Sequence, residues 1–344
     1  PNGGEKNVAI GNYSLDALTT ADGVVAIGHQ AGTSVTTGTE NVMVGYRAGN
    51  NITTGTANTM IGYDAGVLAD NYQNTIIGFK AGDSVSGSDG ANTLIGAEAM
   101  GSASASDVVA VGKWTILDNT ADGTVAIGTE AGRKQTSGAG ATYLGYKAGW
   151  ANTTGSRNLA IGYRAYDNAD TESDNIAIGY DALGGTVAGA EKITAIGNFS
   201  MASLTSGDDN LGIGYYSGNS RDDGAENILS GNYAGRNITS ANRNVAIGHE
   251  ALDANTTGND NIAIGSQSLG AITTGSTNNI GIGFRAGKVM SANAQHNTLI
   301  GGYEAGGGLG DGDYNVMIGT FAGQTATGSS WANTFVGSNS GAGS

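Results

Sequence analysis

The chain has 344 residues, with 61 glycines, a single proline, no cysteine and a formal net charge of −15. The glycines therefore belong neither to a collagen nor to a proline-rich disordered chain, and disulfides and thiolate metal sites are excluded. The acidic balance argues against nucleic acid as a partner, because phosphates are bound by clustered Lys and Arg.

From its first residues the chain repeats one phrase. A residue followed by Gly, apolar in every copy except Ser230, recurs 20 times at spacings of 16 to 18 residues, which leaves no room for a linker or a second kind of domain. Residues 1–344 are therefore predicted to be a single repeat array, and the absence of a starting Met favours a segment of a longer chain. The glycines that close each copy are Gly11, Gly28, Gly45, Gly62, Gly78, Gly96, Gly112, Gly128, Gly145, Gly162, Gly179, Gly197, Gly214, Gly231, Gly248, Gly265, Gly283, Gly301, Gly319 and Gly337.

Each copy is too short for a helical hairpin, which needs some 30 residues. β-Branched residues at alternate positions, bounded by Asn and Gly, are typical of short strands. We therefore predict an all-β fold, a parallel β-solenoid or β-roll of about 20 coils, each with two short strands and two turns. At a strand spacing of about 4.8 Å, 20 such coils would stack to about 95 Å.

Four residues before the closing Gly stands an Asn in 15 of the 20 copies, as at Asn7, Asn41, Asn158 and Asn244. Asparagines at one place in successive coils can form a ladder of hydrogen-bonded amides, so we interpret this column as structural. Thr-Thr-Gly stretches such as 53–55 mark the second turn. The threonine pairs are adjacent and skip coils four to seven, which disfavours a flat ice-binding face.

The residue two before each closing Gly carries no charge or amide in any copy. The residues on either side of it are also mostly apolar, so neither side of the strand is polar. If those neighbours point inward, this column points outward, and an apolar outer seam needs cover from sister copies. The sequence thus predicts a homotrimer. The larger residues of this inter-subunit seam are Met43, Met60, Ile76, Leu94, Tyr143, Leu229, Leu299, Met317 and Phe335.

Two residues after the Gly, charges of largely alternating sign are expected to form a solvated ladder. Beside it, aromatic residues recur at one position in adjacent copies and are candidates for glycan contact, although stacked rings also stabilise neighbouring strands without a ligand. The three tryptophans break their columns and are further candidates. The surface-contact candidates are Tyr46, Tyr63, Phe79, Trp114, Trp150 and Trp331, with a similar stack at Tyr146, Tyr163 and Tyr180.

The pattern N-[VIT]-A-I-G-x-x-[AS], as in residues 7–14, 158–165 and 244–251, resembles head repeats of trimeric autotransporter adhesins. The fuller N-T-x-I-G-Y-x-A-G-x-x-x-T-T-G resembles repeat regions of bacteriophage tail fibre proteins. The resemblance spans essentially the whole chain. It implies a left-handed, trimeric parallel β-roll displayed on an extracellular or virion surface.

Catalytic signatures are missing from the sequence, so no enzymatic activity, cofactor or metal is expected. The pairs Asp208–Asp209 and Asp222–Asp223 are the best candidates for carboxylates that hydrolyse glycans, but adjacent Asp residues are more often turn formers. Calcium is a weaker alternative at residues 306–313 and at Asp167, Asp170, Glu172 and Asp174.

We therefore expect a structural, non-enzymatic fibre shaft that displays a receptor-binding element or contributes to it. Its expected partners are copies of itself and a host cell-surface glycan or protein. The alternative is the subunit of an extracellular filament that grows by end-to-end stacking of solenoids, because an open solenoid end can pair with another. No run of apolar residues is long enough for a membrane helix, so membrane insertion is not expected.

Overall fold

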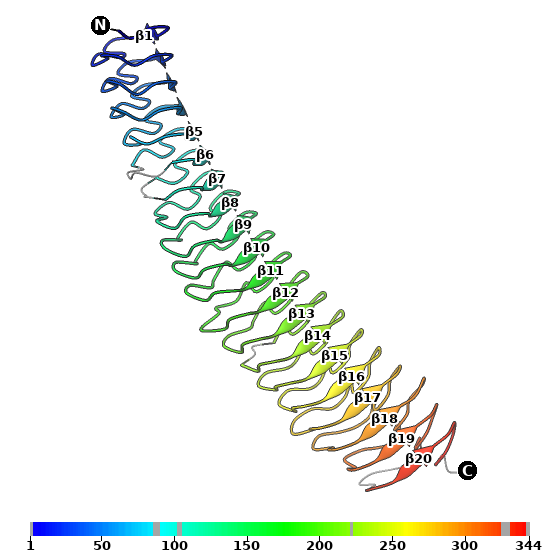
Figure 1. Cartoon of the computed structure of the whole chain (residues 1–344). Coiled ribbons are helices and arrows are strands. Elements are labelled where there is room, and N and C mark those ends of the chain that lie inside the picture. The colour runs from blue at the N-terminus through cyan, green and yellow to red at the C-terminus, as the bar shows by residue number, and fades with distance from the viewer. Residues whose placement is uncertain (1–2, 85–89, 102–104, 221–222, 325–330, 342–344) are drawn as a thin grey trace. The chain divides into compact units, whose positions relative to one another are not determined.

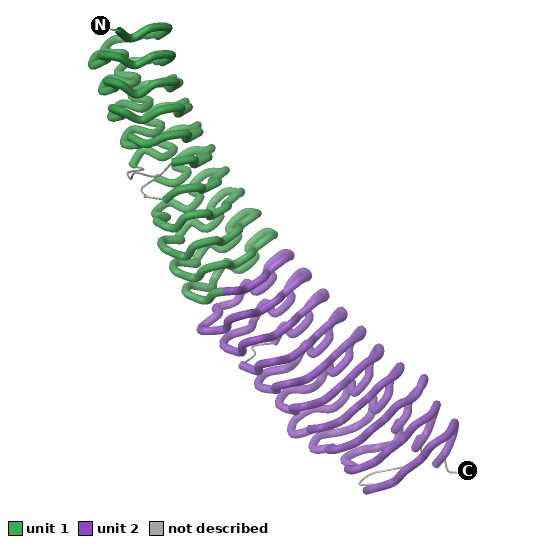
Figure 2. Tube along the Cα trace, in the orientation of Figure 1, with its two compact units in different colours: residues 1–173 green, residues 174–344 purple. Residues whose placement is uncertain are grey.

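The computed structural model describes residues 3–84, 90–101, 105–220, 223–324 and 331–341. The chain is an all-β parallel β-solenoid repeat protein of about 20 coils, as predicted. It divides into two compact units, Pro1–Ser173 and Asp174–Ser344, which Figure 2 colours green and purple. The described ranges contain no helix long and apolar enough to cross a membrane.

Both units consist of three-residue strands, one to a coil, where the sequence predicted two. Figure 1 shows these strands side by side within each unit. The first unit contains β1 (Val8–Ile10), β2 (Val25–Ile27), β3 (Val42–Val44), β4 (Thr59–Ile61), β5 (Thr75–Ile77), β6 (Thr93–Ile95), β7 (Val109–Val111), β8 (Val125–Ile127), β9 (Thr142–Leu144) and β10 (Leu159–Ile161). The second contains β11 (Ile176–Ile178), β12 (Thr194–Ile196), β13 (Leu211–Ile213), β14 (Ile228–Ser230), β15 (Val245–Ile247), β16 (Ile262–Ile264), β17 (Ile280–Ile282), β18 (Thr298–Ile300), β19 (Val316–Ile318) and β20 (Thr334–Val336).

Successive strands within a unit pair in parallel with equivalent residues opposite one another, as Met43 of β3 is opposite Met60 of β4. Backbone hydrogen bonds also join the segments between strands, so that Gly49 N donates to Ala65 O and Asp64 N to Tyr46 O. The rest of the coil therefore needs no second strand, because turns stacked on turns already satisfy its backbone groups.

The predicted asparagine ladder is present. Asn58 is buried, its backbone N–H donates to Asn41 Oδ1 at 3.0 Å, and its own Oδ1 accepts the N–H of Asn74 at 3.0 Å. Its Nδ2 donates to Asn71 O across the next corner at 2.8 Å. The same pattern runs through Asn227, Asn244 and Asn261 in the second unit, so the column is structural in both.

The closing glycines are required by both backbone conformation and space. Gly112 has φ +136°, and a Cβ added to it would lie 2.6 Å from the carbonyl oxygen of Gly128 in the next coil. No larger residue fits there without moving a neighbouring backbone.

The predicted outer seam is wrong. The residues two before the closing Gly point into the coil, and eight of the nine predicted seam residues are 0% exposed; Phe335 in β20 is half-buried. The middle residue of each strand faces inward because the coil interior is narrow, and the two flanking residues then face outward. The corrected residues are Met43, Met60, Ile76, Leu94, Tyr143, Leu229, Leu299, Met317 and Phe335.

The residue that fills the interior comes from the strand in some coils and from the turn after the strand in others. Met60 in β4 occupies the space beside Gly66, where an added Cβ would lie 2.6 Å from the Met60 sulfur. In β11 the strand instead supplies Ala177, and the turn position equivalent to Gly66 carries the buried Leu183. In these two coils one position supplies the large residue and the other the small one, whereas at Gly212 and Gly218 both are small and Met201 and Leu229 of the neighbouring coils fill the space.

Candidate functional site

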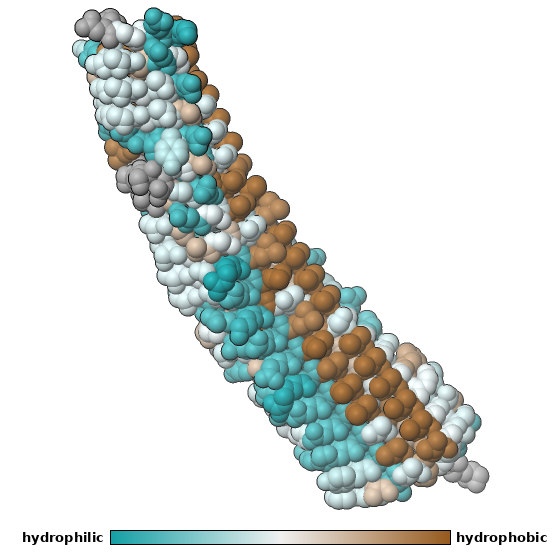
Figure 3. Space-filling view, in the orientation of Figure 1, coloured by the Kyte–Doolittle hydropathy of each residue, from teal (hydrophilic) through white to brown (hydrophobic). Residues whose placement is uncertain are grey.

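The outward face of each strand is uncharged and mostly apolar. The first and third residues of all 20 strands are Val, Ile, Leu or Thr, apart from Ser230, and none is charged. Their exposure is substantial: Ile127 is 38%, Leu144 44%, Ile228 42% and Ile247 41% exposed. Figure 3 shows them as a brown band along the strands of each unit. We call these two rows the strand face.

The strand face is large for a surface in contact with water. Ten strands at about 4.8 Å spacing, each about 10 Å long, cover about 480 Å² in one unit. An apolar patch of 300–600 Å² is the largest that a typical monomer exposes, and it is often functional. Each unit alone reaches that size.

The charged column lies on the turn beyond the strand face. Arg47 Nε lies 3.6 Å from Asp64 Oδ1, and Arg243 forms a shorter pair with Asp260, Nε to Oδ1 at 2.7 Å, on another segment of the coil. The Arg243–Asp260 pair is accessible to water and contributes little stability, whereas Arg47 is exposed and Asp64 is largely buried. They keep this side of the coil hydrated.

The first stack of predicted surface contacts is assembled as expected. Tyr46 and Tyr63 are stacked with centroids 4.9 Å apart, Tyr63 and Phe79 follow at 5.4 Å, and His29 extends the stack at its other end. All three predicted residues are exposed by more than 40%. Tyr146 and Tyr163 are stacked likewise at 5.1 Å.

Two of the tryptophans contact charged side chains of the same unit. The indole N–H of Trp114 donates to Glu98, and Lys113 Nζ lies 3.6 Å from its ring centroid. Trp150 donates to Glu130 and lies under Lys134 Nζ at 3.9 Å. These contacts indicate clamps between coils. Trp331 is 60% exposed.

The acidic residues considered for catalysis act as acceptors at corners. Asp208 accepts the N–H of Glu191 at 2.9 Å, and Asp223 accepts hydrogen bonds from the hydroxyls of Thr205 and Ser206, whereas Asp222 lies outside the described residues. Asp70 is the fullest example, accepting the N–H groups of residues 53–55 at 2.8–2.9 Å. Burial raises the pKa of Asp70, but the hydroxyl of Thr53 and these N–H groups outweigh it and hold the pKa below its usual value.

The residues considered for calcium are likewise engaged by the protein. Asp167 accepts Arg164 Nε at 2.7 Å, Asp170 accepts the Thr153 hydroxyl at 2.6 Å, and Glu172 accepts the N–H groups of residues 170 and 171. In the 306–313 run, Asp313 accepts Gln295 N at 2.7 Å. Within the described ranges, no group of three or more His, Asp or Glu side chains could hold a metal ion.

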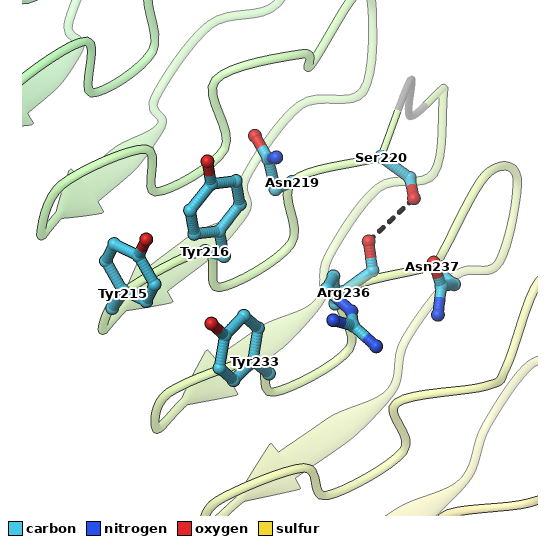
Figure 4. A pocket seen from close by; sticks show the side chains of 7 residues that line it. All are labelled: Tyr215, Tyr216, Asn219, Ser220, Tyr233, Arg236 and Asn237. Atoms are coloured by element: carbon cyan, nitrogen blue, oxygen red, sulfur yellow. Dashed lines mark hydrogen bonds between the residues drawn. The ribbon is translucent and has the colours of Figure 1, made fainter.

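A feature that the sequence did not predict lies beyond strands β13 and β14. Figure 4 shows a groove, of about 510 Å³, that is bordered by three tyrosine rings on one side and by amide and guanidinium groups on the other. The sequence signal was the replacement of the charged column by Phe199, Tyr216 and Tyr233 in three successive coils. We call it the tyrosine groove; its lining residues are Tyr215, Tyr216, Asn219, Ser220, Tyr233, Arg236 and Asn237.

Comparison with known proteins adds no family to these observations. No protein-family model matches the chain, and no curated protein matches it significantly. From its structure, the chain is a parallel β-solenoid repeat protein.

Proposed function

We propose that this chain is a structural, non-enzymatic fibre shaft whose strand faces are covered by sister copies of the same chain. The observation that carries the proposal is the strand face itself, two uncharged and mostly apolar rows that recur from coil to coil. A strand that is apolar on both sides is normally covered on both sides. In the single chain, only the inward side is covered.

A second copy is the occupant that fits this surface best. The rows recur at each coil, so a partner must present complementary side chains with the same period over many coils, and a sister copy does so by construction. Each unit offers about 480 Å², more than half of the roughly 800 Å² per partner in a standard stable interface. The net charge of −15 also explains why the uncharged face is the surface on which like chains can approach.

Parallel copies keep equivalent coils level with one another, and cyclic symmetry closes such an assembly without leaving a face exposed. We propose three copies, the number implied by the resemblance to trimeric autotransporter adhesins. The proposed seam lies on the outward rows, one residue away from the column that was predicted from the sequence.

The resemblance to phage tail fibre and adhesin repeats supports a role in holding a receptor-binding element at an extracellular or virion surface. A solenoid whose coils are hydrogen-bonded to one another within each unit suits that task, because it resists local unfolding better than a flexible linker. The carboxylates considered for glycan hydrolysis serve as corner acceptors, which fits a non-enzymatic role.

Sedimentation equilibrium tests this proposal. The wild-type chain should have a concentration-independent mass near three times its own 34.1 kDa. Replacing Ile228 and Ile247 on the strand face with Lys should lower the mass to that of one chain and leave the circular dichroism spectrum unchanged, because both residues point away from the core.

Val289→Lys is the matched control, since Val289 is 52% exposed but lies outside the strands; it should leave the mass unchanged. A wild-type chain that stays monomeric at high concentration would refute the proposal. A mass that keeps growing with concentration would favour the filament alternative.

A further inference from the structure

The tyrosine groove lies where aromatic residues replace charged or polar ones in three successive coils. In most coils the second residue after the closing Gly is charged or polar, but at coils 12, 13 and 14 it is Phe199, Tyr216 and Tyr233. Tyr215 adds a fourth ring directly after the glycine that follows β13. A shaft needs no such change, because charged residues serve equally well in the neighbouring coils.

The rings hold one another in fixed orientations. Tyr216 lies nearly parallel to Phe199, with centroids 4.8 Å apart, and nearly parallel to Tyr233 at 6.0 Å. Tyr215 packs edge-to-face against Tyr216 at 4.5 Å and against Tyr233 at 5.5 Å. This wall is therefore rigid before any ligand arrives, which lowers the entropy cost of binding.

Polar groups complete the groove, and much of their hydrogen-bonding capacity is unused. The hydroxyls of the three tyrosines have no protein partner within the described ranges, and the amide oxygen of Asn219 is buried without a partner. Ser220 donates to the carbonyl of Arg236 at 2.6 Å, the one bond drawn in Figure 4. The groove thus offers both donors and acceptors around an aromatic wall.

The charge of the groove is already balanced. Arg236 Nη2 lies 2.9 Å from Asp253 Oδ2, and its guanidinium carbon lies 4.9 Å from the ring centroid of Tyr233. Asn237 donates to the carbonyl of the same Asp253 at 2.8 Å. A charged ligand would thus meet a neutralised cation on a chain that is strongly acidic overall.

We propose that the tyrosine groove binds a neutral saccharide. A pyranose ring presents C–H groups on one face, which pack on aromatic rings, and hydroxyls at its rim, which both donate and accept hydrogen bonds. Adjacent coils repeat at about 4.8 Å, similar to the width of one pyranose, so neighbouring units of an oligosaccharide can contact neighbouring coils. This binding does not require the lateral assembly of copies, so either proposal can fail alone.

Saturation-transfer NMR with the full chain tests the assignment. The probes are maltotetraose, chitotetraose and mannotetraose as neutral saccharides, with tetragalacturonate and sialyllactose as anionic ones. We expect at least one neutral probe to receive saturation at its ring C–H protons. Tyr216→Asn should weaken its affinity at least tenfold, and Asn is chosen because residue 216 has φ +53°, a conformation that Asn tolerates.

Tyr216→Phe and Tyr233→Phe retain the rings and should weaken binding severalfold less than Tyr216→Asn. Tyr72→Ala is the control, because Tyr72 is 48% exposed and does not line the groove; it should leave binding unchanged. The proposal is overturned if no neutral probe binds, if only the anionic probes bind, or if a folded Tyr216→Asn chain binds as tightly as the wild type.

Discussion

Moving the large interior residue of one coil from the strand to the turn tests how the solenoid is packed. Met60 is 0% exposed, and its sulfur would lie 2.6 Å from a Cβ placed on Gly66. Met60→Ala should cost about 3 kcal/mol, within the range for truncating a buried Met. Gly66→Leu alone should cost a similar amount, because it overpacks the interior and places Leu at φ +60°.

The double variant Met60→Ala/Gly66→Leu should lose only about 1–2 kcal/mol, far less than the sum of the two single losses. It reproduces the combination found in another coil, where Ala177 and Leu183 are both fully buried and Leu183 has φ +48°. The remaining loss reflects the left-handed backbone at residue 66, which Gly adopts freely and Leu does not.

Urea denaturation followed by circular dichroism measures these differences, and hydrogen exchange of the β4 amides localises them, since long repeat arrays need not unfold in two states. Leu68→Ala, at a side chain that is 41% exposed in the same coil, should change stability little. Additive single losses, or a Met60→Ala chain that dissociates from its sister copies with its own stability unchanged, would refute the packing described here.

Three further predictions concern the ladder, the closing glycines and the corners. Asn58→Ala should cost about 3 kcal/mol and speed hydrogen exchange at Asn74, whose buried N–H loses its acceptor; unchanged exchange would contradict this. Gly112→Ala should destabilise the chain by several kcal/mol in urea melts, because its Cβ would collide with the carbonyl of Gly128, and full stability would show that the coils can separate. Asp70→Asn should be less stable than the wild type at neutral pH, where the carboxylate of depressed pKa stabilises its corner; the difference should shrink as pH falls below its ordinary pKa of 3.8, and a pH-independent difference would contradict the role of its charge.

Much of the coil was predictable because it repeats. The closing glycines fixed the period, and the asparagine column indicated a ladder that the structure confirms at Asn41, Asn58 and Asn74. A ladder of this kind depends only on equivalent positions being stacked, and stacking follows directly from the repeat. The second strand of the coil was not found, because turns stacked in register satisfy their backbone groups without it.

The facing of the strand was not predictable from alternation alone. Alternation shows which residues share a side, but a shift by one residue exchanges the two sides completely. The larger β-branched residues suggested the interior, whereas the structure turns them outward and places Met43 or Ala177 inside. The sequence does contain a signal for the inward side: the large Met60 accompanies the small Gly66, as expected if both positions share the interior.

The tyrosine groove lay beyond sequence reasoning for a different reason. Tyr216 and Arg236 are 20 residues apart and belong to different coils, and the groove between them depends on how far each turn projects. Equivalent positions of the repeat form columns in the sequence, whereas this groove joins positions that are not equivalent. Only the substitution of aromatic for charged residues pointed toward it.

The position of the large interior residue differs from coil to coil, so the coils are not interchangeable. A coil with Met in its strand, such as Met60, has Gly at the facing position of its turn, and an insertion that duplicates one coil places its interior residues beside neighbours of unmatched size. Lengthening such a protein, in evolution or by engineering, should therefore succeed more often when a block of several adjacent coils is copied than when one is. The order of the coils therefore matters for packing, even though their sequences look alike.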